Sequence, residues 1–123
     1  MTSVDFFGNS IGDEGLISLV DVLKDNTTVT RLGLSSNFIG NEGAIALAEM
    51  LKDNIAITSV DLWGNFIGSE GAIALATALK DHNTVLRIDI GAFGDGNPIG
   101  VDGATALKEM LAVNSKVTFL GIN

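Results

Sequence analysis

The chain has 123 residues and no cysteine, 46% of its residues are hydrophobic, and its formal net charge is −8. It therefore forms no disulfide, contains no apolar run long enough for a membrane span, and opens with no signal-peptide pattern. The negative charge disfavours nucleic acids and anionic membranes as partners but is compatible with basic or neutral proteins. An acidic surface that serves solubility alone is the alternative interpretation.

One segment is repeated along the whole chain, so the sequence predicts a single domain, 1–123, built from similar units. The second and third copies match at 16 of 28 positions without a gap. The copies are 1–28, 29–56, 57–84, 85–116 with a four-residue insertion, and a partial copy at 117–123. A fixed period of this length is typical of a solenoid.

Each copy opens with a strand pattern, in which apolar residues alternate with others, as in Val60-x-Leu62 of the third copy. The equivalent pairs are Val4-x-Phe6, Leu32-x-Leu34, Ile88-x-Ile90 and Leu120-x-Ile122. Because successive strand residues point to opposite faces, the apolar set is predicted to be buried and the intervening set to face outward.

An asparagine follows each of the first four strands, with an isoleucine two residues later. We interpret these residues as a structural ladder whose buried amides bond the backbone of neighbouring turns. The ladder consists of Asn9, Asn37, Asn65 and Asn97.

The second half of each copy has helical periodicity, seen in the apolar set Ala72, Leu75, Ala76 and Leu79. Polar residues at the helix starts are predicted to be N-caps, and asparagines at the helix ends are predicted to adopt the left-handed stop conformation. The expected caps are Asp13, Asn41 and Ser69, and the expected stop residues are Asn26, Asn54 and Asn114.

The combined motif, VxxLxLxxNxIGxEGAxALAxxLKxN, resembles the ribonuclease-inhibitor-like subfamily of leucine-rich-repeat proteins. This subfamily includes the repeats of NOD-like receptors and of the Ran GTPase-activating protein. The resemblance covers the whole chain. It implies an α/β fold: a short solenoid with a curved parallel sheet inside and helices outside. It also implies a cytoplasmic, non-enzymatic module that binds a protein through the sheet.

Curvature is expected on physical grounds as well, since strands stack about 4.8 Å apart while helices need about 8–10 Å. The concave sheet face is therefore the surface that the chain's own packing leaves open. We predict that a protein partner binds there. The candidate binding residues are Phe7, Trp63, Asp5, Asp61, Asp89, Arg31 and Arg87.

The aromatic candidates Phe7 and Trp63 occupy the same column two strands apart, a backbone separation of about 10 Å. Exposed aromatic residues on a rigid surface are typical of binding hot spots. The alternative is that Trp63 only shields Gly33 and Gly64.

The acidic candidates Asp61 and Asp89 are neighbours about 5 Å apart, which is unfavourable unless a cation lies near them. Arg31, Arg87 or a basic group of a partner would supply that cation.

The inserted residues lie within 91–98 and place Phe93 and Asp95 in a rim loop that serves recognition or reflects tolerated drift. Too few oxygen ligands accompany Asp95 for a calcium site, and no nucleophile, base and acid come together. The sequence therefore predicts no metal, no cofactor and no enzymatic activity.

The first and last copies lack polar capping repeats. One interpretation is self-association, with a homodimer forming through terminal strands and with Leu120 and Ile122 on the exposed edge. The other interpretation is that the chain is a fragment of a longer repeat protein. Regulation of a small GTPase is a weaker functional alternative, which the Ran-activator resemblance permits.

Overall fold

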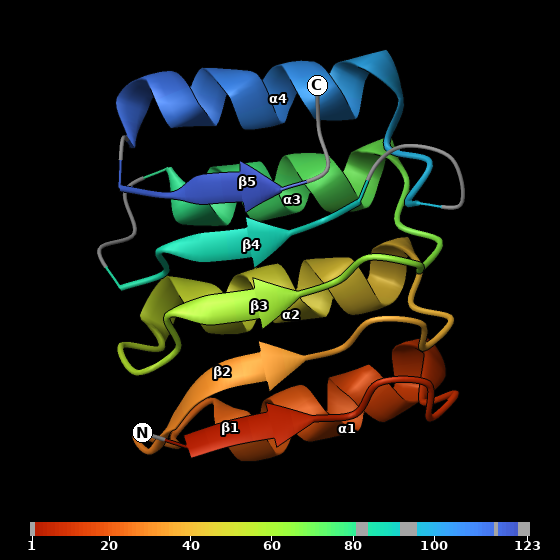
Figure 1. The fold of residues 1–123 in the computed structure, drawn as a ribbon, viewed down its shortest axis with the longest axis vertical. Coiled ribbons are helices and arrows are strands. Elements are labelled where there is room, and N and C mark those ends of the chain that lie inside the picture. The colour runs from red at the N-terminus through yellow and green to blue at the C-terminus, as the bar shows by residue number, and fades with distance from the viewer. Residues whose placement is uncertain (1, 81–83, 92–95, 115, 121–123) are drawn as a thin grey trace.

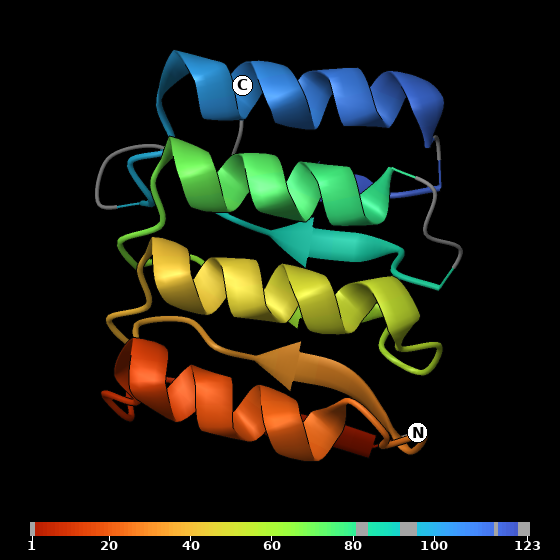
Figure 2. The same ribbon diagram turned by 180° about the vertical axis from the view of Figure 1, so that it is seen from behind.

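Strands and helices alternate along the chain and form two layers, with all strands on one side and all helices on the other (Figures 1 and 2). The computed structural model describes residues 2–80, 84–91, 96–114 and 116–120. The strands are β1 Thr2–Asp5, β2 Val29–Gly33, β3 Ser59–Asp61, β4 Arg87–Asp89 and β5 Thr118–Leu120. The helices are α1 Gly12–Leu23, α2 Asn41–Asp53, α3 Ser69–Leu79 and α4 Gly100–Val113.

The strands of the described residues form one parallel sheet in chain order, β1-β2-β3-β4-β5. Each strand is joined to the next through one helix, and the helices pack side by side behind the sheet (Figure 2). Residues at equal repeat positions pair across the sheet, as Leu32 does with Val60 and Val60 with Ile88. The α/β fold with alternating parallel strands and helices, predicted from the sequence, is confirmed.

The hydrophobic core lies between the two layers. Leu32 and Leu34 from the strand side and Leu47 and Leu75 from the helix side have no exposed surface. Burying a leucine side chain completely stabilises the folded state by about 1.5–3 kcal/mol, so each copy adds several such contributions.

The longest helix of the described residues, α4, has 14 residues. None of the helices found there combines the length and the apolar character that a bilayer crossing requires.

In the second, third and fourth copies, the ladder asparagine bonds the turn of the preceding copy. Asn37 Nδ2 donates to the carbonyl oxygen of Phe6 at 2.9 Å, and Asn37 Oδ1 accepts from the backbone N–H of Asn9 at 2.9 Å. Asn65 and Asn97 make equivalent bonds one and two copies further on. Because these amides are buried, they supply hydrogen bonds that water cannot supply.

The polar residues at the helix starts do not cap their own helices, contrary to the prediction. The N-caps of α2 and α3 are Gly40 and Gly68, and neither helix has a side-chain cap bond of its own. Instead, Asp13 of α1 accepts from the N–H groups of Gly40 and Gly43 at 2.7 and 3.0 Å.

Asn41 acts in the same way on the next copy. Its Oδ1 accepts from the N–H groups of Gly68 and Gly71, both at 2.9 Å. Each side chain therefore satisfies the free N–H groups of the following helix, which a pattern within a single copy does not reveal.

The asparagines at the helix ends are extended, so the predicted left-handed stop is wrong. Asn54 has φ −77° and ψ 129°, and Asn114 has φ −109° and ψ 91°. Asn54 Oδ1 accepts from the N–H groups of Ala56 and Ile57, and its Nδ2 donates to the carbonyl oxygen of Leu23 in the preceding copy. The amide thus ends the helix through side-chain bonds.

The register of β5 differs by one residue from the expected alignment. Phe119 pairs with Ile88 and Leu120 with Asp89, whereas the repeat pattern aligned Leu120 with Ile88. Within the described residues β5 has a neighbour on one side only, so a single ladder determines its register.

Candidate functional site

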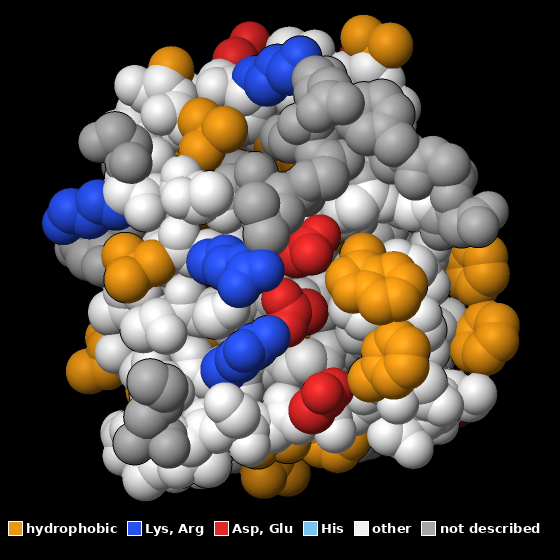
Figure 3. Space-filling model, in the orientation of Figure 1, with side chains coloured by type: hydrophobic (Ala, Val, Ile, Leu, Met, Phe, Trp, Pro, Cys, Tyr) orange, Lys and Arg blue, Asp and Glu red, His pale blue; other side chains and the backbone are white. Residues whose placement is uncertain are grey.

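The sheet face opposite the helices is the open sheet face, and its side chains fall into three columns. The strand registers align Ser3, Arg31, Ser59 and Arg87 in the first column and Asp5, Gly33, Asp61 and Asp89 in the second. The backbone bonds just beyond the strands align Phe7, Ser35, Trp63 and Gly91 in the third. Figure 3 shows basic, acidic and hydrophobic side chains side by side over the strands. All seven candidate binding residues therefore lie on this one face.

A single ion pair crosses the open sheet face among the described residues. Arg31 Nη2 on β2 lies 3.1 Å from Asp61 Oδ2 on β3. The Asp61 side chain is 16% exposed and that of Arg31 is 52% exposed. A pair that is half in water contributes at most about 1 kcal/mol, so Arg31 can exchange this partner for another at low cost.

Asp89 lies beside Asp61 in the acidic column and is only partly exposed. Burial and, next, the neighbouring charge of Asp61 raise the pKa of the Asp89 carboxyl above its usual value. The Arg87 guanidinium and a hydrogen bond with the Gly91 backbone act in the opposite direction without cancelling the effect. The Asp89 carboxyl therefore ionises less readily in the folded protein than in the unfolded chain.

A hollow of about 180 Å³ opens in the acidic column, where β2 carries glycine instead of a larger side chain. It is lined by Ser3, Val4, Asp5, Arg31, Gly33 and Asp61. The Asp5 carboxylate extends over the glycine, since a Cβ added to Gly33 would lie 2.6 Å from Asp5 Oδ1. The same oxygen accepts the backbone N–H of Phe7 at 2.9 Å, which fixes the carboxylate at the edge of the hollow.

The rings of Phe7 and Trp63 are in contact, with centroids 5.7 Å apart and planes inclined by 43°. They are closer than the two strand spacings, about 10 Å, that separate their backbones, because the residue between them, Ser35, is small and lets the rings lean together. Both stay accessible, with 55% of Phe7 and 44% of Trp63 exposed.

The glycine that Trp63 covers is Gly91, where an added Cβ would lie 2.6 Å from Trp63 Cβ. The atoms closest to a Cβ position on Gly33 belong to Asp5. The alternative in which Trp63 shields Gly33 and Gly64 stays a prediction.

A second exposed aromatic pair was missed in the sequence. The rings of Phe38 and Phe66 stack with centroids 5.8 Å apart, and 60% and 59% of these residues are exposed. Each of these phenylalanines directly follows a ladder asparagine. The recurrence of Asn-Phe-Ile in the second and third copies therefore indicates the pair in the sequence. In Figure 3 hydrophobic side chains continue from the sheet face onto the rim formed by the loops after the strands.

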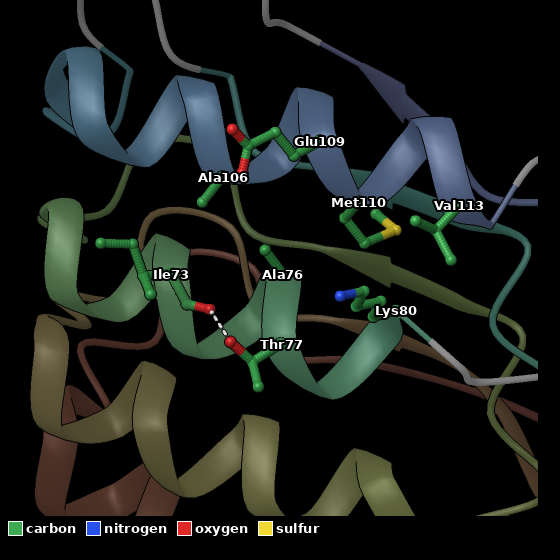
Figure 4. A pocket seen from close by; sticks show the side chains of 8 residues that line it. All are labelled: Ile73, Ala76, Thr77, Lys80, Ala106, Glu109, Met110 and Val113. Carbon is green, nitrogen blue, oxygen red and sulfur yellow. Dashed lines mark hydrogen bonds between the residues drawn. The ribbon is translucent and has the colours of Figure 1, made fainter.

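A shallow groove of about 320 Å³ separates α3 from α4 on the helix side (Figure 4). Small and apolar residues line it, with Lys80 and Glu109 at its border. Thr77 uses its hydroxyl within its own helix, donating to the Ile73 carbonyl oxygen at 2.9 Å. This groove has less charge and fewer exposed aromatic rings than the open sheet face.

The remaining candidates concern the insertion and the last strand. Phe93, Asp95 and Ile122 lie outside the described residues, and Leu120 ends β5. The described part of the chain contains no group of three His, Cys, Asp or Glu side chains placed to hold a metal ion.

Comparisons with known proteins agree with this geometry. The leucine-rich-repeat family model matches residues 1–20, 25–48 and 53–76, which is more than half of the chain. A solved structure of the leiomodin-1 actin-binding site 2 superimposes with a TM-score of 0.84 at 28% identity. The match covers 98% of this chain and 69% of the leiomodin chain. No curated protein sequence matches significantly.

Asp89→Asn is expected to raise the free energy of unfolding at pH 7 by up to about 0.5 kcal/mol, the range of surface substitutions. The folded state binds the Asp89 proton more tightly than the unfolded state, whose pKa is near 3.8, so ionisation above that pH costs stability. The difference between variant and parent should shrink as the pH falls towards 4. Urea unfolding at several pH values measures it, and a variant less stable than the parent at pH 7 contradicts the account.

Proposed function

This chain belongs to the leucine-rich-repeat family, and we propose that it is a non-enzymatic module that binds a protein partner on its open sheet face. Repeat modules of this kind generally bind proteins and do not catalyse reactions. As part of the proposal, residues 1–123 form a single domain of the ribonuclease-inhibitor-like subfamily, with the repeat boundaries given above, and act in the cytoplasm.

The observation that carries the proposal is the exposed contact between Phe7 and Trp63 beside the charged columns. Tryptophan and arginine are over-represented among residues that dominate binding energies, especially where the surrounding contacts exclude water. Here the ring pair lies next to the column that contains Asp5 and Asp61. Arg31 lines the same hollow as these two carboxylates. The contact between the rings holds them in place before a partner arrives, which lowers the entropy cost of binding.

Actin is the first defined partner to test, because the similar leiomodin-1 structure is described as an actin-binding site. The proposed binding surface does not depend on that choice. A different protein that contacts Phe7 and Trp63 would fit the proposal equally well.

Trp63→Ala is expected to weaken binding of the partner at least tenfold, which corresponds to about 1.4 kcal/mol. Proteins retained by the immobilised parent chain, with purified actin included as a defined probe, identify the partner, whose dissociation constant is then measured. Ile55→Ala is the matched control, since Ile55 is 77% exposed and lies in the turn before β3. Equal affinities of the parent and Trp63→Ala would remove the aromatic pair from the binding site.

Self-association is a second candidate, favoured by the two ends of the sheet. Within the described residues, β1 and β5 each have a neighbour on one side only, which leaves backbone groups available for another strand. In the first copy Val4 and Phe6 are only partly buried, whereas their equivalents Leu32 and Leu34 are fully buried. A second copy that paired with a terminal strand would extend the sheet.

Light scattering over a range of concentrations tests this candidate. It predicts a dimer that Leu120→Lys converts to a monomer, because a charge on the edge strand opposes pairing. Val113→Lys, at a position 58% exposed on α4, should leave the dimer intact. A monomeric parent at every concentration contradicts self-association.

A further inference from the structure

The hollow over Gly33 has the shape and charge to hold a positively charged side chain. We propose that it receives an arginine or lysine of the protein partner, and that an apolar residue next to that basic residue packs against Phe7 and Trp63. This inference rests on the proposed binding function and specifies the chemistry of the partner.

Glycine at position 33 lets the Asp5 carboxylate lie over β2, at the edge of the hollow that receives the incoming group. Its neighbours in the column, Asp5 on β1 and Asp61 on β3, stand on opposite sides of it. Their backbones are two strand spacings, about 10 Å, apart. A cation entering the hollow therefore meets the Asp5 carboxylate over the glycine and, beyond it, the Asp61 carboxylate that Arg31 already contacts. A guanidinium has enough donors to bond both carboxylates.

The charges on this face favour a cation. Three carboxylates, those of Asp5, Asp61 and Asp89, share the face with the arginines Arg31 and Arg87. Arg31 is paired with Asp61, and no ion pair to Asp5 is found among the described residues. Since the neighbouring Asp61 charge also raises the pKa of Asp89, an additional cation would relieve repulsion within the column.

The aromatic pair provides the second half of the site. Phe7 and Trp63 follow Asp5 and Asp61 by two residues on the same face, so the rings begin about 7 Å from the acidic column. A cation near the face of an aromatic ring gains about 0.5–1 kcal/mol at an exposed site. The rings also offer apolar surface to the stem of the basic side chain and to its neighbour.

An unsatisfied hydroxyl lies in the same column as these rings. Ser35 is 3% exposed, and its Oγ has no hydrogen-bond partner among the described residues. It lies between Phe7 and Trp63 in the third column of the open sheet face. A buried hydroxyl without a partner costs about 1–3 kcal/mol, so a peptide group of the partner would gain by bonding it where binding shifts the rings that flank it. The hydroxyl is not part of the lining of the hollow and belongs to the aromatic half of the site.

The other two exposed features do not specify an occupant. The groove between α3 and α4 has one base and one acid at its border, which favour neither charge. The Phe38–Phe66 pair lies in the turns after β2 and β3, outside the charged columns of the open sheet face. Among the described residues, the hollow at Gly33 combines space, charge and neighbouring aromatic surface.

Fluorescence of Trp63, the only tryptophan of the chain, reports binding at this site directly. The probes are two peptides, acetyl-Leu-Arg-Leu-amide and the same peptide with citrulline in place of arginine. Citrulline has nearly the same shape but no charge. We expect the arginine peptide to change Trp63 emission with a dissociation constant at least tenfold lower than that of the citrulline peptide. Added salt should reduce this preference.

Asp5→Asn should reduce the preference for arginine to less than threefold. The asparagine oxygen can still accept the N–H of Phe7, so the turn geometry is preserved. Asp25→Asn is the charge-matched control, because Asp25 is an exposed acid in the turn after α1. It should keep the tenfold preference.

Three results overturn the inference: no change in Trp63 emission up to 10 mM arginine peptide, equal binding of both peptides, or an unchanged preference in Asp5→Asn. None of them decides the proposed function, which depends on the loss of the protein partner in Trp63→Ala. If Trp63→Ala weakens binding of the protein partner while the arginine and citrulline peptides bind the parent equally, the open sheet face remains the proposed binding surface. In that case the proposed preference for a basic residue is wrong.

Discussion

The side-chain amides of Asn37, Asn65 and Asn97 hold the turns of this protein in register, and the open sheet face depends on them. The Asn65 side chain, for example, accepts from two backbone N–H groups of the second copy. It also donates to the carbonyl oxygen of Leu34 in the second copy and to that of Leu62 in the third. Water cannot replace these bonds in a buried turn, so they fix the distance and rotation between copies. Phe7 and Trp63 begin from these turns, and the contact between their rings requires a constant offset from copy to copy.

Hydrogen bonds from a side chain of one copy to the backbone of the next also connect the helices. Asp13 and Asn41 each bond the start of the helix of the following copy, so neighbouring copies also stabilise each other in the helix layer. Because these bonds stabilise the fold, the side chains of the open sheet face are available to bind a partner. The raised pKa of Asp89 means that its ionised carboxylate costs stability, which fits a residue that serves a surface.

The repeat period and the alternation of Val60 and Leu62 were sufficient to predict the α/β fold. They also aligned Phe7 with Trp63 and Asp5 with Asp61, because equal repeat positions pair across a parallel sheet. The pattern of a single copy could not show that Asp13 caps its neighbour's helix. Nor could it show how far two rings lean together over Ser35, which depends on side-chain packing. The Phe38–Phe66 pair was missed because turn residues were assumed to be structural.

The most direct test of this account compares Asn65→Ala with Asn9→Ala by chemical denaturation. Asn65 is 2% exposed and its side chain bonds two copies, whereas the side chain of the exposed Asn9 donates to its own turn. The account predicts a loss of about 3 kcal/mol or more for Asn65→Ala, because several buried backbone groups lose their partners. It predicts less than about 1 kcal/mol for Asn9→Ala. Equal, small losses for the two variants would show that the asparagine amides do not hold the copies together.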